Sequence, residues 1–240
     1  MFDIWLEQYK ELEIKVGEHW IVNFWQFPVN MDTVLTAWIA MIAIMLLTFV
    51  ITRKLDIFPD GIQTIAEQFM GFIEGIIKSY MDKEGLKHTP LIASLFLFIL
   101  FANLEGQLPW RLFPLPGEPA SPTNDINTTL GLALVVSVYY IGAGIMEKGF
   151  GYFKHYLQPM WFLFPFNLLE DFTRPLSLSL RLFGNILAGE LIIVILVSMV
   201  PYLAPVPMML FELFVAFLQA YIFAVLATNY IAAATSKEHH

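Results

Sequence analysis

Residues 33–52 read TVLTAWIAMIAIMLLTFVIT, a run of 20 positions without a charged side chain. A helix needs about 20 apolar residues to cross the roughly 30 Å hydrocarbon core of a bilayer. The run has that length, and two basic residues, Arg53 and Lys54, follow it directly. We therefore predict a membrane-spanning helix over 33–52, and this segment sets the class of the whole protein.

The composition of the 240-residue chain agrees with a membrane protein. Apolar residues make up 58% and charged residues 14%, against roughly 45–50% and 25% in soluble domains. Mean hydropathy is +0.65, and this much apolar bulk excludes a disordered chain. The absence of Cys excludes disulfides, thiol catalysis and Cys-zinc sites. The net charge of −8 argues against nucleic-acid binding.

Further apolar segments predict the remaining helices. Residues 89–104 begin with a Thr-Pro pair, and proline suits the first turn of a helix. Residues 126–146 carry no charge, and the long apolar stretch that follows is divided by prolines into 167–199 and 206–234. We predict an all-α integral membrane protein, one membrane domain over 1–240 with five transmembrane helices.

Residues 60–81 have a different pattern, with apolar side chains at helical spacing on one face only. Glu74 and Lys78 lie on the polar face in i,i+4 register. This pattern is typical of a helix lying in the membrane interface, and a helix packed against other protein is the alternative. The segment 1–30 lacks the features of a cleaved signal peptide, and loop 105–125, rich in Pro and Gly, predicts irregular structure.

The basic residues predict the orientation. Loops 53–88 and 147–174 carry five and three of them, whereas loop 105–125 carries one. Because cytoplasmic loops are enriched in Lys and Arg, we expect the first two loops and the C-terminus on the cytoplasmic side, and residues 1–30 outside.

Arg181 lies inside the apolar run. A charged Arg near the membrane centre costs at least about 2.5–3.5 kcal/mol and usually serves an ion path, and Arg does not lose its proton. The alternative is a side chain that reaches the interface or forms a structural ion pair. Ser177, Asn185 and Ala188 fall on the same helical face as Arg181.

Two intramembrane acids flank the proline-rich turn of the last two helices. Glu190 is nine residues from Arg181 and so about 180° around the helix from it, whereas Glu212 shares a face with Gln219. In an antiparallel hairpin Glu190 and Glu212 would lie at similar depth, which suits a proton relay. A structural hydrogen-bonded pair is the alternative.

Helices over 167–199 and 206–234 would be about 50 Å and 44 Å long at 1.5 Å per residue. Both exceed the bilayer core, so we expect them to tilt or bend. Pro175 offers a bend point, and Asn167 with Glu170 could cap the first of these helices.

At residues 174–191, RPLSLSLRLFGNILAGEL, the chain resembles subunit a of the F-type ATP synthase. The stretch resembles the cyanobacterial and chloroplast branch, although Gly189 stands where that branch usually has Asp. Further matching stretches are FANL 101–104, LPWR 108–111, PTNDINTT 122–129, NLLEDF 167–172 and LQAYIF 218–223.

The resemblance implies a stator subunit, not catalytic alone, whose two long tilted helices face a rotating ring of c subunits. Its partners would be that ring, the b subunits of the peripheral stalk, the rest of the complex, and the lipid of a bacterial plasma membrane or thylakoid-type membrane. Protons would be the transported ion, with sodium as the alternative, and no cofactor or metal is implied.

The resemblance also implies roles for particular residues. Arg181 matches the essential arginine that faces the ring carboxylates. The other matched positions are Asn185 and Gln219 near that arginine, Ser177 on its face, Glu190 and Glu212 in the outer half-channel, and Glu170 and Asp171 in the cytoplasmic half-channel.

Two other functional classes compete with this interpretation. A secondary transporter would predict inverted repeats, and none is evident in the sequence. A membrane scaffold protein would have no need of Arg181 and two intramembrane acids.

Overall fold

The computed structural model of the chain describes residues 21–24, 27–53, 55–57, 61–108, 121–149, 151–152, 162, 164–199 and 205–236. Three predicted features lie wholly or largely outside these residues. They are the outer segment before residue 21, most of loop 105–125 and the turn at 200–204.

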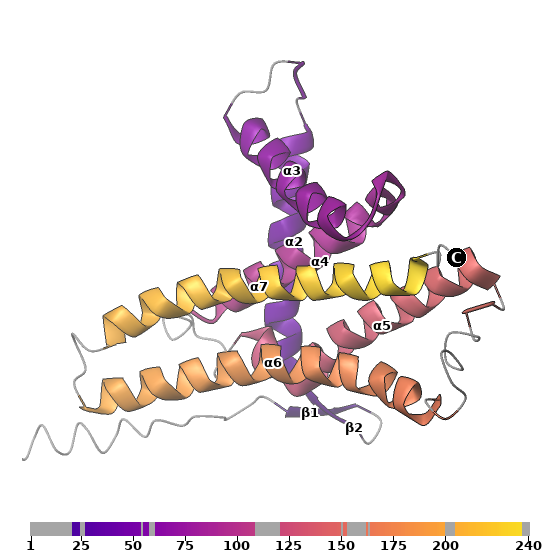
Figure 1. Ribbon diagram of the computed structural model, residues 1–240. Coiled ribbons are helices and arrows are strands. Elements are labelled where there is room, and N and C mark those ends of the chain that lie inside the picture. The colour runs from indigo at the N-terminus through magenta and orange to yellow at the C-terminus, as the bar shows by residue number, and fades with distance from the viewer. Residues whose placement is uncertain are drawn as a thin grey trace, which may run out of the picture.

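The described residues form a helical protein with one small β-hairpin (Figure 1). The elements in chain order are β1 Ile21–Phe24, β2 Phe27–Asn30, α2 Met31–Thr52, α3 Ile62–Tyr80, η1 Lys83–His88, α4 Thr89–Glu105, η3 Pro122–Asn124, α5 Ile126–Lys148, α6 Phe164–Met199 and α7 Pro205–Thr235.

Five of the described helical segments are long and apolar enough to cross a membrane. They are Met31–Thr52, Lys83–Glu105, Ile126–Lys148, Phe164–Met199 and Pro205–Thr235. Helices satisfy their backbone hydrogen bonds internally, which is the condition for crossing lipid. The predicted class, an all-α integral membrane protein, is confirmed.

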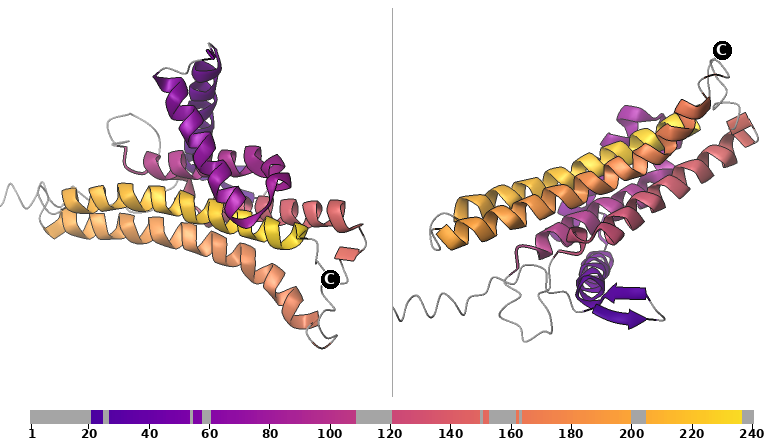
Figure 2. Two further views of the ribbon diagram at one scale, coloured as in Figure 1. Left: turned by 45° about the horizontal axis from the view of Figure 1, so that its top comes forward. Right: turned by 90° about the horizontal axis from the view of Figure 1, so that it is seen from below.

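Helices α6 and α7 form a long antiparallel hairpin. They contain 36 and 31 residues, so they extend about 54 Å and 46 Å at 1.5 Å per residue. They lie side by side in every view and cross α2 steeply (Figures 1 and 2). Figure 2 shows α6 bending in its N-terminal third, the part that contains Pro175. Proline cannot donate its backbone hydrogen bond, which favours a bend there.

The core lies where α4 and α5 pack against this hairpin. Helix α7 presents Ala216, Ala220, Ala224 and Ala227 on one buried stripe. Small side chains let helices approach closely in a membrane protein, so α4 and α5 can both pack on α7. On the other side of the core, Thr129 of α5 and Ser179 of α6 share a buried hydrogen bond of 3.0 Å.

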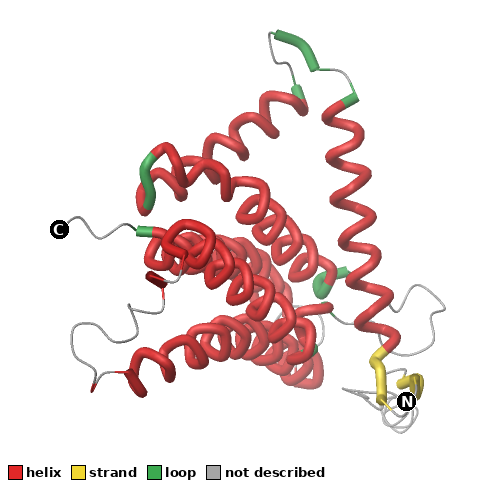
Figure 3. Tube along the Cα trace, turned by 90° about the vertical axis from the view of Figure 1, so that its right-hand side faces the viewer, coloured by secondary structure: helices red, strands yellow, loops and turns green. Residues whose placement is uncertain are grey.

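Helices α2 and α3 form an arm that projects from the bundle (Figure 3). The C-terminal half of α3 is buried through Ile73, Ile76 and Ile77, whereas Ile62 and Ile65 near its start are exposed. The predicted pair of Glu74 and Lys78 is present at 2.9 Å. Packing on protein extends back to Phe69, whose ring lies 5.5 Å from that of Phe96 on α4, and a position of the first turns of α3 in the interface stays a prediction.

Two local features differ from the expectations. Helix α6 begins at Phe164, so Asn167 lies within the helix and the predicted capping by Asn167 and Glu170 is wrong. The second feature, the hairpin of β1 and β2, was not predicted; Ile21 is opposite Asn30 in its register. Asn30 then donates a hydrogen bond of 2.8 Å to Asp125, the residue whose carboxylate caps α5.

Candidate functional site

Arg181 lies near the middle of α6, on a face that carries small and polar side chains. Its Nη2 is 3.4 Å from Ser177 Oγ, one turn earlier on the same helix. Ser177, Gly184 and Ala188 on this face are exposed, and Arg181 itself is half-buried. The guanidinium is therefore held along the surface of α6, where a neighbouring helix of another chain could approach it.

Asn185 and Gln219 join the two long helices one turn beyond Arg181. Asn185 Nδ2 donates to Gln219 Oε1 at 2.8 Å, and the Gln219 side chain is 2% exposed. A buried amide oxygen is costly to leave without a donor, so this bond fixes the register of the hairpin beside the arginine.

The two intramembrane acids line one pocket, which we call the Glu190 pocket. Asn124 Nδ2, in η3, donates to Glu190 Oε2, and Gln107 Nε2, just after α4, donates to Glu212 Oε2. Glu212 Oε1 is buried and has no hydrogen-bond partner within the part of the chain that the structure describes. The lining residues are Asn103, Gly106, Gln107, Asn185, Ile186, Glu190, Glu212 and Val215.

Gly189 makes room for the Glu212 carboxyl group. A Cβ added at Gly189 would lie 2.9 Å from Cδ and 3.2 Å from Cγ of Glu212, and closer still to Oε1. Such distances are below normal van der Waals contact. The absence of a side chain at 189 therefore permits the position that Glu212 takes between α6 and α7.

A buried hydroxyl network holds η3 beside this pocket. Ser121 Oγ donates to the carbonyl of Ala102 at 2.8 Å, and Thr123 Oγ1 donates to Asn103 Oδ1 at 2.7 Å. Both bonds join η3 and the residue before it to the end of α4. Because buried hydroxyls with all partners satisfied are rigid, the network fixes the place from which Asn124 reaches Glu190.

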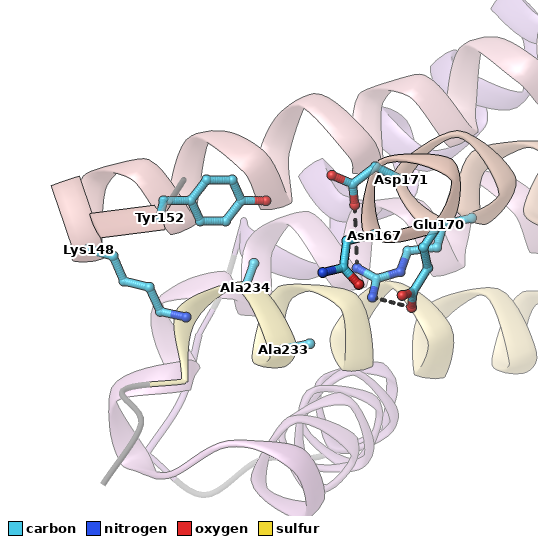
Figure 4. A pocket seen from close by; sticks show the side chains of 8 residues that line it. Lys148, Tyr152, Asn167, Glu170, Asp171, Ala233 and Ala234 are labelled. Carbon is cyan, nitrogen blue, oxygen red and sulfur yellow. Dashed lines mark hydrogen bonds and ion pairs between the residues drawn. The ribbon is translucent and has the colours of Figure 1, made fainter. Parts of the chain in front are cut away.

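A second pocket lies at the other end of the hairpin, and we call it the Glu170 pocket. Figure 4 shows Glu170 and Asp171 toward one end of it and Lys148 and Tyr152 toward the other. Arg174 Nη2 donates to Glu170 Oε1 at 2.6 Å, and its Nη1 is 3.7 Å from Asp171 Oδ1. The lining residues are Lys148, Tyr152, Asn167, Glu170, Asp171, Arg174, Ala233 and Ala234.

The two pockets lie on opposite sides of Arg181 along the hairpin. Asp171 precedes Arg181 by ten residues and Glu190 follows it by nine, which corresponds to about 15 Å and 14 Å along α6. The arginine therefore stands between two separate polar cavities, near the exposed face of the hairpin.

The structure groups the predicted site residues into three sets. Asn185, Glu190 and Glu212 line the Glu190 pocket, with Gln219 bonded to Asn185, while Glu170 and Asp171 line the Glu170 pocket. Arg181 and Ser177 lie between them. Among the described residues, no group of three or more His, Asp and Glu could hold a metal ion.

Sequence reasoning did not assign functions to Gln107, Asn124 or Arg174. Asn124 falls in the matched stretch 122–129, which was a usable signal. Gln107 carries no pattern, because its partner Glu212 is 105 residues away in sequence. Arg174 was counted among the charges of loop 147–174, although it also lies within the helix expected over 167–199.

Comparison with known proteins agrees with this arrangement. Residues 34–232 match the family model described as ATP synthase A chain. The chain is 45% identical over 231 residues to "ATP synthase subunit a, chloroplastic" of Stigeoclonium helveticum, covering 95% of this chain and 94% of that protein. It is also 45% identical to the protein of the same name from Oedogonium cardiacum, covering 95% and 91%. A match that spans the helices and both pockets leaves one conclusion, that this chain belongs to the ATP synthase subunit a family and to the membrane sector of that complex.

Proposed function

We propose that this chain is the proton-translocating stator subunit of its ATP synthase. It forms two offset aqueous half-channels that load and unload protons on the carboxylates of a rotating c-ring, and so couples proton flow to rotation and ATP synthesis. It has no catalytic activity alone. Its partners are the c subunits, the b subunits of the peripheral stalk and the remaining complex, in a membrane with residues 1–30 outside and the C-terminus cytoplasmic.

One observation carries the proposal: the two polar pockets are separated by Arg181. A single channel through the chain would let protons cross without turning a ring. Two pockets, each reaching only part of the way along the hairpin, require an external carrier between them. A carboxyl group on another chain, moving past the exposed face of α6, supplies that carrier.

The face of α6 that carries Arg181 suits contact with ring helices. Ser177, Gly184 and Ala188 are small and exposed on it, so the backbone of a partner helix can come close. Leu191 and Ile195 continue the exposed surface in apolar form. A polar centre with an apolar end is the surface expected of a sliding contact within lipid.

The outer half-channel uses Glu190 and Glu212. Gln107 and Asn124 each donate to one carboxylate oxygen, while Glu212 Oε1 is buried and accepts no bond from described residues. A proton entering from outside passes through water and these carboxylates to a ring carboxylate. The neutral ring group can then turn into lipid, where a charged carboxylate would be prohibitively costly.

Arg181 completes the cycle. A ring carboxyl group returning from lipid releases its proton toward the Glu170 pocket, where Glu170 and Asp171 line the way to the cytoplasm. The resulting carboxylate is stabilised by the guanidinium, which remains protonated. The same fixed charge repels a hydronium ion between the pockets and so prevents a leak, and Asn185 with Gln219 orients this region of the hairpin.

The test is Arg181→Ala in the full complex reconstituted into vesicles, assayed by ATP-driven acidification. We expect loss of coupled pumping with normal assembly. Arg53→Ala is the matched control, because Arg53 lies just beyond α2 and lines neither pocket. Coupled pumping that survives Arg181→Ala would overturn the proposal.

The coupling ion is part of the proposal, and sodium is the alternative to the proton. Both pockets offer carboxylates, which can take up and release protons. Vesicles that acidify in sodium-free buffer would support proton coupling. ATP-driven uptake of labelled sodium, with acidification strictly dependent on sodium, would show sodium coupling and overturn proton coupling.

A further inference from the structure

Arg174 joins three helices at one end of the bundle. It lies on α6, its guanidinium is 5.9 Å from the ring centre of Tyr140 on α5, and it is 5.2 Å from that of Tyr230 on α7. Cations placed over aromatic rings at such distances are attracted to the ring face. The position of Arg174 is therefore set by neighbours from both sides as well as by its own helix.

The two acids that contact Arg174 have different surroundings. Asp171 also accepts a hydrogen bond of 3.1 Å from the Tyr140 hydroxyl, and its side chain is 17% exposed. Glu170 is bonded to Arg174 by one i,i+4 contact, and its side chain is 57% exposed. Asp171 is thus confined by two helices, while the Glu170 side chain is largely exposed.

These surroundings suit different tasks. A carboxylate beside a confined cation is costly to unpair, because its partner would remain half-buried without a counter-charge. An exposed ion pair on a helix surface is worth little and opens readily. Of the two acids, Glu170 can exchange protons with water at small cost, whereas Asp171 cannot move without disturbing Arg174 and Tyr140.

We propose that Arg174 is a positioning residue that keeps Asp171 as a permanent structural anion and leaves Glu170 as the carboxylate that exchanges protons in the Glu170 pocket. This inference rests on the proposed function. Glu170 accepts a proton that a ring carboxyl group has released through water, and gives the same proton to bulk water. Arg174 keeps its proton throughout.

The first experiment compares Glu170→Gln with Asp171→Asn in the reconstituted full complex. Both substitutions remove one charge and keep the side-chain size. We expect Glu170→Gln to slow ATP-driven pumping per assembled complex severalfold with normal heat stability. Asp171→Asn is expected to lower assembly or heat stability, which Glu170→Gln leaves normal. Equal losses of assembly and heat stability in the two variants, or the reverse pattern, would overturn the proposal.

Arg174 is tested by two substitutions in the same complex. Arg174→Met removes the charge and is expected to reduce assembly as Asp171→Asn does, because Asp171 then lacks its cation. Arg174→Lys keeps the charge and is expected to restore most of the assembly, although an ammonium cannot lie flat between two rings. Normal assembly of the Met variant would contradict the positioning role.

A chemical readout separates this inference from the proposed function. The chain has no Cys, so each of the single substitutions Glu170→Cys and Asp171→Cys gives one thiol in this chain, and its labelling is read on this subunit after separation from the others. We expect a membrane-impermeant thiol reagent to label position 170 much faster than position 171, whether or not protons are pumped. Similar labelling rates would refute the assigned difference, even if Arg181→Ala behaves as the proposed function requires.

Discussion

Gly189→Ala tests whether the position of Glu212 matters for transport. The new Cβ would lie 2.9 Å from Glu212 Cδ, whereas carbon atoms pack best at about 3.5–4.0 Å. The Glu212 carboxyl group must therefore retreat by about 0.6 Å or more, which strains its bond from Gln107.

The size of the effect follows from two opposing contributions. Overpacking costs about 1–3 kcal/mol, and replacing Gly by Ala within a helix returns up to about 1 kcal/mol. A net cost of about 1 kcal/mol that falls on the proton-transfer barrier slows turnover about fivefold. We expect a loss of ATP-driven pumping of this order in reconstituted complex.

Two comparisons make the prediction specific. Gly131→Ala on α5 is the control, because a Cβ there meets nothing within 4 Å. Gly189→Ala should lower the thermal midpoint of the purified complex. Adding Gly189→Ala to the Glu212→Gln variant should lower the midpoint by the same amount. Adding it to the Glu212→Ala variant should not lower the midpoint, because the obstructing carboxyl group is gone. If Gly189→Ala behaves as Gly131→Ala does, or if its cost is unchanged beside Glu212→Ala, the reasoning is refuted.

Two other contacts give direct predictions. Asn185→Leu leaves the buried Gln219 oxygen without its 2.8 Å donor and should cost about 1–3 kcal/mol of stability. Adding Gln219→Leu should recover part of that stability. Denaturation of the complex measures the two variants, and additive losses would count against the bond. Gly144→Ala places a Cβ 2.7 Å from Tyr152 Cδ2 and 3.2 Å from a backbone oxygen of α7, so it should cost about 1–3 kcal/mol of stability. Gly142→Ala has open space around it and should be tolerated. Equal stability of the two variants would contradict the packing.

The helices could be predicted from the sequence because lipid restricts what may lie inside it. The expected span 33–52 corresponds to α2, which begins at Met31, and 126–146 corresponds to α5, which ends at Lys148. Charges mark where the apolar core ends, while each of these helices continues for two residues beyond it. The boundaries therefore differ by the few residues that hydropathy does not determine.

The composition of the pockets was harder to predict, because it depends on contacts between distant segments. Helical spacing placed Ser177 beside Arg181, and the structure has that contact at 3.4 Å. The same rule says nothing of Asn124 and Glu190, which are 66 residues apart. Pairs of this kind depend on how α5 packs against α6. Periodicity within one helix carries no information on the packing between helices.

The two pockets hold their acids by different means, and the difference fits opposite tasks. Glu190 and Glu212 receive neutral amide donors from the two ends of the connection between α4 and α5. Glu170 and Asp171 instead pair with Arg174, whose guanidinium keeps its charge. The acids of one pocket therefore face neutral donors and those of the other face a fixed cation, and this distinguishes the two ends of the hairpin to which the proposed function assigns loading and unloading.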